Sequence, residues 1–357
     1  TIDNDKKLDE KKKEERKQKC LDNLKDFLNP DNSELLDFTS FDGNAQGFRV
    51  LTKTQFLNDL YGLNLTYASL ASFLKYPNFG KPCKNEGIAL HKHGIFTTEK
   101  EIVQDVMGGC SIDKLNDNSY CRHPFSFIME ACDTICYLVM DMEDAYNKGW
   151  ISFEMIEHLK NSKLKKVLRT SKTHYDKDNP ERKKIVQLRV DLINYFVSYA
   201  ICRFMSNLQK IIEGSFNEEL LFNENDGNCL AKFLSDFSIK NIYSHREMQS
   251  LELTCDAVIT GIMDHYVKFL FSEDKSYRMK GKKLISHASF YTTLQEHLNM
   301  EANNDSMKAK KAWLEYTDFD PKDLTFGERI RIIRDFVSGM TDRFALLHYQ
   351  KLNGQKI

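Results

Sequence analysis

The segment that decides the fold is Glu130-Ala-Cys-Asp-Thr-Ile-Cys-Tyr-Leu-Val-Met-Asp-Met-Glu-Asp144. Apolar residues recur in and just before it at the spacing of a buried helix: Ile128, Met129, Ile135, Leu138, Val139 and Met142. Polar residues recur at spacings of three and four, within an arc of roughly 80°. These residues, which we call the acidic stripe, are Glu130, Asp133, Tyr137, Asp141 and Asp144. We expect Glu143 to point away from them, into solvent.

The acidic stripe has two interpretations, because a buried helix excludes charges unless they are paired or bind a cation. In the first, the carboxylates pair with Arg and Lys side chains of neighbouring helices. In the second, they belong to a metal and phosphate site. A hard divalent cation takes carboxylate oxygens as ligands, and a tyrosine one turn away can hydrogen-bond a phosphate or sugar oxygen. The segment alone leaves both interpretations open.

The composition is that of a globular, largely helical protein. The 357 residues carry a net charge of −1, and only 16 are Gly and 6 are Pro, which argues against a β-sandwich or barrel. The nine cysteines form no CxxC pair, which is typical of a reducing compartment. With no obvious transmembrane run or signal peptide, we expect a cytoplasmic location and no membrane partner. The first residue is Thr, which we interpret as a processed, clipped or separately supplied end.

The pattern along the chain predicts an essentially all-α fold in three parts. Residues 1–39 are a charged helix or loop, 40–150 hold the acidic stripe, and 151–357 are a helical C-terminal region. Stretch 160–189 carries 11 Lys and Arg against three acids, which is typical of a solvated surface or of a patch for polyphosphate or single-stranded nucleic acid. Further helices are expected over 63–74, 185–213, 244–271 and 328–352. The helix from residue 244 is expected to open with a capping box of Ser244 and Glu247.

Polar residues at turns and helix ends are further candidates. Asn44 can cap the helix that follows it or reach a ligand. Lys75 and Tyr76, just before Pro77, can present an ammonium and a phenol to a phosphate, although such residues are often simply exposed. His91 and His93 have the spacing of one strand face, but only loop geometry would bring both to a metal.

Several segments, in order from about residue 40 to the C-terminus, together resemble the deoxyguanosine triphosphate triphosphohydrolase family of the HD-domain metallohydrolases. They are Phe41–Arg49, Leu63–Tyr67, Leu74–Pro77, His93–Glu99, Arg122–Tyr137, Asp141–Asp144, Leu188–Val190, Ile242–His245, Leu251–Leu253 and Ser338–Asp342. The resemblance implies an HD-domain-like helical metallohydrolase with additional C-terminal helices, in which residues 40–150 are the C-terminal part of the catalytic core. It also implies metal-dependent hydrolysis, with Mg²⁺, Mn²⁺ or a similar ion, of dGTP to deoxynucleoside and tripolyphosphate, with other dNTPs as further candidate substrates. A homo-oligomer is expected.

Roles are implied residue by residue. Asp133 matches the last metal ligand of the family. Tyr137 and Asp141 match residues that contact the sugar and phosphate region, and we group them with Asp133 as catalytic residues. The residues matching the lining of the nucleotide and triphosphate pocket are Asn44, Lys75 and Tyr76, with Tyr243 and Glu252 near the nucleotide.

Two departures from the family pattern matter. Thr134 stands where the family commonly has a second Asp. The upstream His and His-Asp ligands are also absent, because no His precedes His91 and no His-Asp dipeptide occurs. A catalytic metal needs three or four ligands.

Three explanations follow from the missing ligands. The favoured one is that the chain is the larger C-terminal part of an enzyme whose metal centre is completed by an N-terminal companion polypeptide or a missing segment. The second is a non-catalytic nucleotide-binding or single-stranded-DNA-binding regulatory subunit. The third is a metal site rebuilt from His91, His93 and His123.

Overall fold

The computed structural model describes residues 25, 27–29, 33–55, 62–161, 180–222, 229–298 and 318–355. The predicted all-α fold is confirmed. In the described part, the strands β1 (Lys114–Asn116) and β2 (Ser119–Tyr120) form one short antiparallel hairpin, and the regular structure is otherwise helical. Most of the charged stretch 1–39 and most of the basic stretch 160–189 lie outside the described residues, and the predicted domain boundaries stay a prediction.

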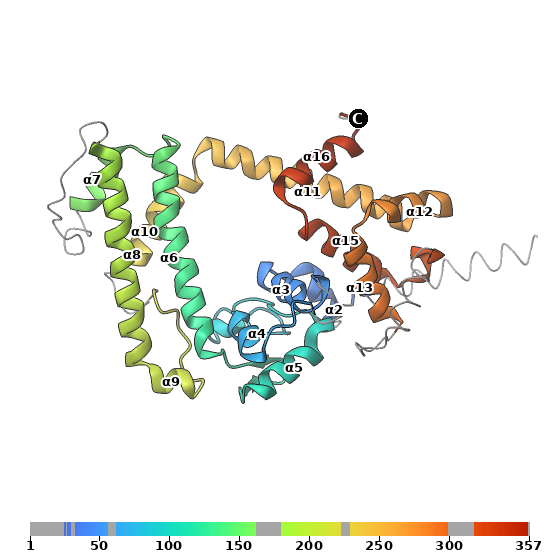
Figure 1. Cartoon of the computed structure of the whole chain (residues 1–357), viewed down its shortest axis with the longest axis horizontal. Coiled ribbons are helices and arrows are strands. Elements are labelled where there is room, and N and C mark those ends of the chain that lie inside the picture. Colours follow the sequence, from blue (N-terminus) through green and yellow to red (C-terminus); the bar gives the residue numbers. More distant parts are fainter. Residues whose placement is uncertain are drawn as a thin grey trace, which may run out of the picture.

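The helices gather around three apolar cores (Figure 1). The first group is α2 (Ser33–Thr39), α3 (Gly43–Arg49), η1 (Val50–Thr54), α4 (Tyr67–Phe73), η2 (Ile88–Leu90), η3 (Thr97–Glu99) and α5 (Lys100–Gly109). The second is α6 (Pro124–Asn147), α7 (Phe153–Asn161), α8 (Pro180–Ser206), α9 (Leu208–Ile212), α10 (Leu230–Ser238) and η5 (Ile239–Tyr243). The third is α11 (Arg246–Phe271), α12 (Lys275–Leu284), α13 (His287–His297), η6 (Pro321–Asp323), α15 (Phe326–Ser338) and α16 (Asp342–Leu352). Helix α11 runs from the second group to the third.

Helix α6 carries the acidic stripe and begins where the sequence predicts. Pro124 is its first residue, and the ring of His123 accepts a hydrogen bond from the Phe125 amide. Ile135, Leu138, Val139 and Met142 are buried as expected. The expectation for Ile128 was wrong: it is 41% exposed, because it lies on the outer face of α6 with Phe125.

The expectation that Glu143 is solvated was also wrong. Its carboxylate accepts a hydrogen bond of 2.6 Å from Arg189, and its side chain is 15% exposed. The reason is tertiary packing: α8 lies against α6 and brings Arg189 within reach. Thus part of the charge on α6 pairs with a neighbouring helix.

Helix α8 is interrupted earlier than the pattern predicts. The expected single helix over 185–213 ends at Ser206, and α9 begins at Leu208. The side chain of Asn207 donates to the Arg203 carbonyl, which caps the end of α8. Gly214, with φ +71°, then supplies the left-handed turn after α9.

Helix α8 is also the described helix that is long and apolar enough to cross a membrane, judged by length and composition alone. Its Glu181–Ser206 segment reaches a mean hydropathy of 1.2. A single helix of this kind is weak evidence for a membrane span, and 28% of its apolar window is buried inside the structure. Core helices pass the same test, and Ile185, Leu188, Leu192 and Phe196 are buried in the core shared with α6.

Two further expectations about helix ends were wrong. At α11 the cap is His245, whose ring nitrogen accepts from the Glu247 amide, whereas the Ser244 hydroxyl donates back to the Lys240 carbonyl. The expected helix over 328–352 is two helices, because Gly339 ends α15 and Thr341 caps α16.

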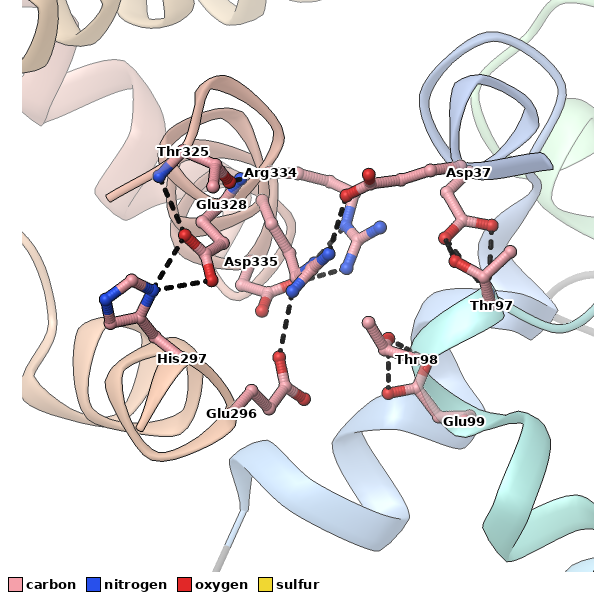
Figure 2. A network of polar contacts seen from close by, with 12 residues as sticks. Asp37, Thr97, Thr98, Glu99, Glu296, His297, Thr325, Glu328, Arg334 and Asp335 are labelled. Atoms are coloured by element: carbon pink, nitrogen blue, oxygen red, sulfur yellow. Dashed lines mark hydrogen bonds and ion pairs between the residues drawn. The ribbon is translucent and has the colours of Figure 1, made fainter. Parts of the chain in front are cut away.

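A buried polar network joins the first group to the third (Figure 2). Arg49 of α3 is fully buried and donates to Asp335 at 2.7 Å, Glu99 at 2.6 Å and Glu296 at 2.9 Å. Arg334, stacked on the Phe96 ring at 3.6 Å, donates to the same Asp335. Helix α3, which carries Asn44, is thereby tied to α13 and α15.

Candidate functional site

The site lies where the N-terminal end of α6 meets the end of α4 (Figure 1). The Ser126 hydroxyl of α6 is within hydrogen-bond distance of the Ala71 carbonyl at 3.2 Å and the Leu74 carbonyl at 3.1 Å. These contacts fix the last turn of α4 on α6. They place the next residues, Lys75 and Tyr76, beside the acidic stripe.

Lys75 meets the first two carboxylates of the acidic stripe. Its ammonium lies 3.5 Å from Glu130 Oε1 and 3.7 Å from Asp133 Oδ2. Glu130 is buried and pairs with Arg122 at 2.9 Å, whereas the Asp133 side chain is 70% exposed. The first interpretation of the acidic stripe, pairing with basic side chains, therefore holds for Glu130. The carboxylate of Asp133 is accessible to solvent and to a ligand.

Tyr76 and Asn44 extend the site on the other side of Lys75. Tyr76 is buried, and the ammonium groups of Lys75 and Lys92 lie 5.7 and 5.4 Å from its ring centroid. Lys92 also contacts Asp42 at 3.0 Å, and Asp42 accepts from the Asn44 amide side chain at 2.8 Å. Asp42, not Asn44, caps α3, so the capping interpretation of Asn44 was wrong. Asn44 joins Lys75 through this chain of contacts.

Tyr137 and Asp141 lie one and two turns beyond Asp133. The pKa of the Tyr137 phenol is raised to about 12, mainly by burial; a hydrogen bond with Thr134 opposes the rise, and nearby carboxylates add to it. Tyr137 is thus a neutral hydrogen-bond donor near pH 7. The Tyr243 hydroxyl donates to Asp141 at 2.6 Å, and burial together with this carboxylate raises the pKa of Tyr243.

Glu252 is the predicted residue that the structure does not bring to this cluster. It is exposed on α11, and in the described part of the chain no hydrogen bond or ion pair joins it to the residues above. Asp144, the last residue of the acidic stripe, is likewise exposed. The site is therefore built on the first three turns of the stripe rather than on its whole length.

Glu219 is a site residue that sequence reasoning missed. It lies in the connection after α9, where nothing in the local sequence indicates burial. The pKa of its carboxyl is raised to about 7, mainly by burial and also by the charge of Glu130, while the charges of Lys75 and Arg122 oppose the rise. Only the packing of this connection against α6 could reveal it.

Replacing Glu219 by Gln is expected to raise the free energy of unfolding by about 1–3 kcal/mol at pH 8, and by little at pH 5. With a pKa raised from 4.5 to about 7, the folded state binds the proton more tightly than the unfolded state. Stability therefore falls as the pH rises through this window, and the amide removes that loss. Urea unfolding at both pH values measures the effect. The exposed neighbour Glu218, which pairs with Arg203, provides the control variant Glu218→Gln. An equal gain at both pH values for Glu219→Gln would contradict the prediction.

The described residues do not by themselves form a metal centre. Among them, no group of three or more His, Cys, Asp or Glu side chains comes close enough to hold an ion. His93 is buried against Asp37 at 2.9 Å, and His123 caps α6 and contacts Ser72. A site rebuilt from the three histidines is thus not formed in this structure. Asp133 offers one open carboxylate.

Several known proteins that are similar to this chain carry the same name. A deoxyguanosinetriphosphate triphosphohydrolase from Klebsiella pneumoniae (strain 342) is 29% identical over 343 residues, which cover 88% of this chain and 64% of the relative. Proteins of the same name from Enterobacter sp. (strain 638) and Salmonella typhi are 28% identical over the same shares. This chain thus spans 64% of the length of these curated relatives. No protein-family model matches the chain.

Proposed function

Because the chain belongs to the deoxyguanosinetriphosphate triphosphohydrolase family, we propose that it binds dGTP as part of an enzyme that releases deoxynucleoside and tripolyphosphate. Other dNTPs are further candidate substrates. The observation that carries this proposal is one continuous set of contacts, through Lys75, between two distant segments of the chain. The contacts run from Asn44 through Asp42, Lys92 and the Tyr76 ring to Lys75, and from Lys75 to Asp133, on the helix that also carries Tyr137 and Asp141.

The charges of the cluster suit a triphosphate. The ammonium groups of Lys75 and Lys92 both lie near the Tyr76 ring, and the Asn44 amide can donate to an oxygen. Cations held in place are needed where charge is spread over three phosphates. When the ligand enters, these ammonium groups can exchange their carboxylate partners for phosphate oxygens.

We propose that Asp133 supplies one ligand to a divalent metal such as Mg²⁺ or Mn²⁺. The remaining ligands would come from outside the described residues, on a companion N-terminal polypeptide or a preceding segment. A bound divalent metal supplies an activated water and polarises phosphoryl oxygens in reactions of this class.

Three further properties are part of the proposal. Exposed apolar residues on α8 and α11, such as Ile201, Met205, Leu251 and Leu253, suit burial between copies of the chain in a homo-oligomer. The basic stretch 160–189 is a candidate contact for single-stranded DNA. We also propose a cytoplasmic location, as expected from the cysteine pattern.

Replacing Tyr137 by Ala is expected to lower the preference for dGTP over GTP at least about tenfold. In the proposed complex, the half-buried phenol of Tyr137 lies against the sugar and leaves no room for the 2′-hydroxyl of a ribonucleotide. The smaller Ala side chain would make room for that hydroxyl. The ratio of the kcat/KM values for the two nucleotides measures the change. Tyr146→Ala on the same helix, where the phenol bonds the exposed Glu181, is the matched control. An unchanged ratio in Tyr137→Ala would rule out this role.

The experiment that tests the proposed function is tripolyphosphate release from each dNTP by the full-length protein, with Mg²⁺ or Mn²⁺. Release from dGTP supports the proposal, and no release from any dNTP overturns it. Binding of dNTP or oligonucleotide without turnover, with strong salt dependence, would instead identify the regulatory, non-catalytic subunit.

A further inference from the structure

The buried pair Arg122–Glu130 has no assigned part in the proposed chemistry. Both side chains are 1% exposed, and Arg122 Nη1 donates to Glu130 Oε2 at 2.9 Å. Arg122 is itself held in place, because its guanidinium stacks on the Phe127 ring at 4.2 Å and donates to the Ser126 carbonyl at 3.3 Å. The pair thus presents the second oxygen of Glu130 in a defined position.

That second oxygen, Oε1, faces Lys75. It is buried and accepts no hydrogen bond in the described part of the chain, and the Lys75 ammonium approaches it at 3.5 Å. A buried carboxylate oxygen without a partner is costly, so this approach is favoured. The Lys75 side chain is 16% exposed, so it can still reach a ligand.

A lysine needs such a partner to be held in one position. Its ammonium is a point charge on a flexible four-carbon stem. The other carboxylate nearby, Asp133, is 70% exposed and lies 3.7 Å away, so it restrains Lys75 weakly. Because Arg122 already neutralises Glu130, Glu130 can orient Lys75 while the three side chains together keep one net positive charge.

We propose that Glu130, held by Arg122, is a positioning residue that aims the Lys75 ammonium at the triphosphate. The inference rests on the proposed function, because it assumes that Lys75 binds that group. Glu130 acts through Lys75 and does not touch the nucleotide. Its effect should therefore depend on the phosphates and on the presence of Lys75.

Calorimetric titration of the full-length protein with dGTP and with deoxyguanosine tests this. Glu130→Gln is expected to weaken dGTP binding about tenfold and deoxyguanosine binding less than about twofold. Lys75→Met is expected to weaken dGTP binding at least as much. Adding Glu130→Gln to Lys75→Met should then change the dGTP affinity less than about twofold, since the two side chains act as one unit. The control is Glu143→Gln, which breaks an ion pair with Arg189 on the same helix and should leave both affinities unchanged.

A merely structural role gives a different pattern. It predicts that Glu130→Gln weakens the binding of dGTP and of deoxyguanosine equally, or that Glu130→Gln still weakens dGTP binding in the Lys75→Met background. Either result overturns the inference. If Glu130→Gln does not fold, the double variant Arg122→Met with Glu130→Met removes the positioning carboxylate without leaving a buried charge, and the same dGTP-specific loss is expected. Wild-type protein that binds no dGTP would overturn the proposed function itself. Binding with additive effects overturns the positioning role alone.

Discussion

Replacing Asp335 by Ala is expected to lower the free energy of unfolding by about 3–5 kcal/mol. The carboxylate is fully buried and accepts hydrogen bonds from Arg49 at 2.7 Å, Arg334 at 2.9 Å and Gln46 at 3.2 Å. Without it, the two guanidinium groups of Arg49 and Arg334 stay buried and lose their shared partner. The same contacts hold α3 on α15, so the first and third helix groups should separate more readily (Figure 2). Urea unfolding followed by circular dichroism measures the loss.

The matched control is an exposed ion pair. Asp236 accepts a hydrogen bond of 2.7 Å from Lys232 one turn earlier on α10, and both side chains are more than half exposed. Asp236→Ala is expected to cost less than about 1 kcal/mol, as is usual for surface pairs. Similar losses in the free energy of unfolding for Asp335→Ala and Asp236→Ala would contradict the prediction that burial makes the Asp335 contacts more important for stability.

The same network should make the protein sensitive to acid. Burial alone would raise the pKa of Asp335, but Arg49 and Arg334 outweigh it and hold the pKa below its usual value of 3.8. The pKa of Glu296 is lowered for the same reason. Burial alone would raise it, but the cations Arg49, Lys53 and Arg331 outweigh burial. The stability that these carboxylates contribute is therefore present above about pH 4. It is lost as the pH falls through their lowered pKa values.

Replacing Asp133, the proposed metal ligand, by Ala is expected to abolish divalent-metal binding by the full-length protein and to lower kcat for dGTP more than about a hundredfold. Loss of a residue that only orients a metal ligand already lowers metal affinity or activity about 10–100-fold. Asp133 is proposed as a direct ligand, so a larger loss is expected. Its carboxylate is 70% exposed and lies 3.7 Å from the Lys75 ammonium, so an ion can reach it. Elemental analysis of the purified protein and tripolyphosphate release measure the two effects.

Asp144→Ala is the control for this prediction. Asp144 belongs to the same acidic stripe on α6 but is exposed and outside the cluster of site residues. Metal content and turnover within about twofold of the wild type are expected for it. Retention of metal by Asp133→Ala would show that the ion is held without this carboxylate.

The sequence by itself determined the all-α fold class, the start of α6, and the residues that carry the family resemblance. These features are local. A proline after a ring that can cap, as at His123 and Pro124, specifies a helix start within one turn. The three- and four-residue spacing of the acidic stripe then specifies which side chains share a face.

Only the tertiary structure decided which of those side chains are paired, buried or open. Glu143 meets Arg189 across 46 residues, and Arg49 meets Asp335 across 286, so no local pattern could show either pair. Glu219 is another example, because its raised pKa comes from the packing of an unremarkable connection beside Glu130. Helix caps and the hydrogen bonds within a helix join residues only a few positions apart, whereas burial and ion pairing depend on which helices pack together. Packing made Glu130 a buried partner and left Asp133 open.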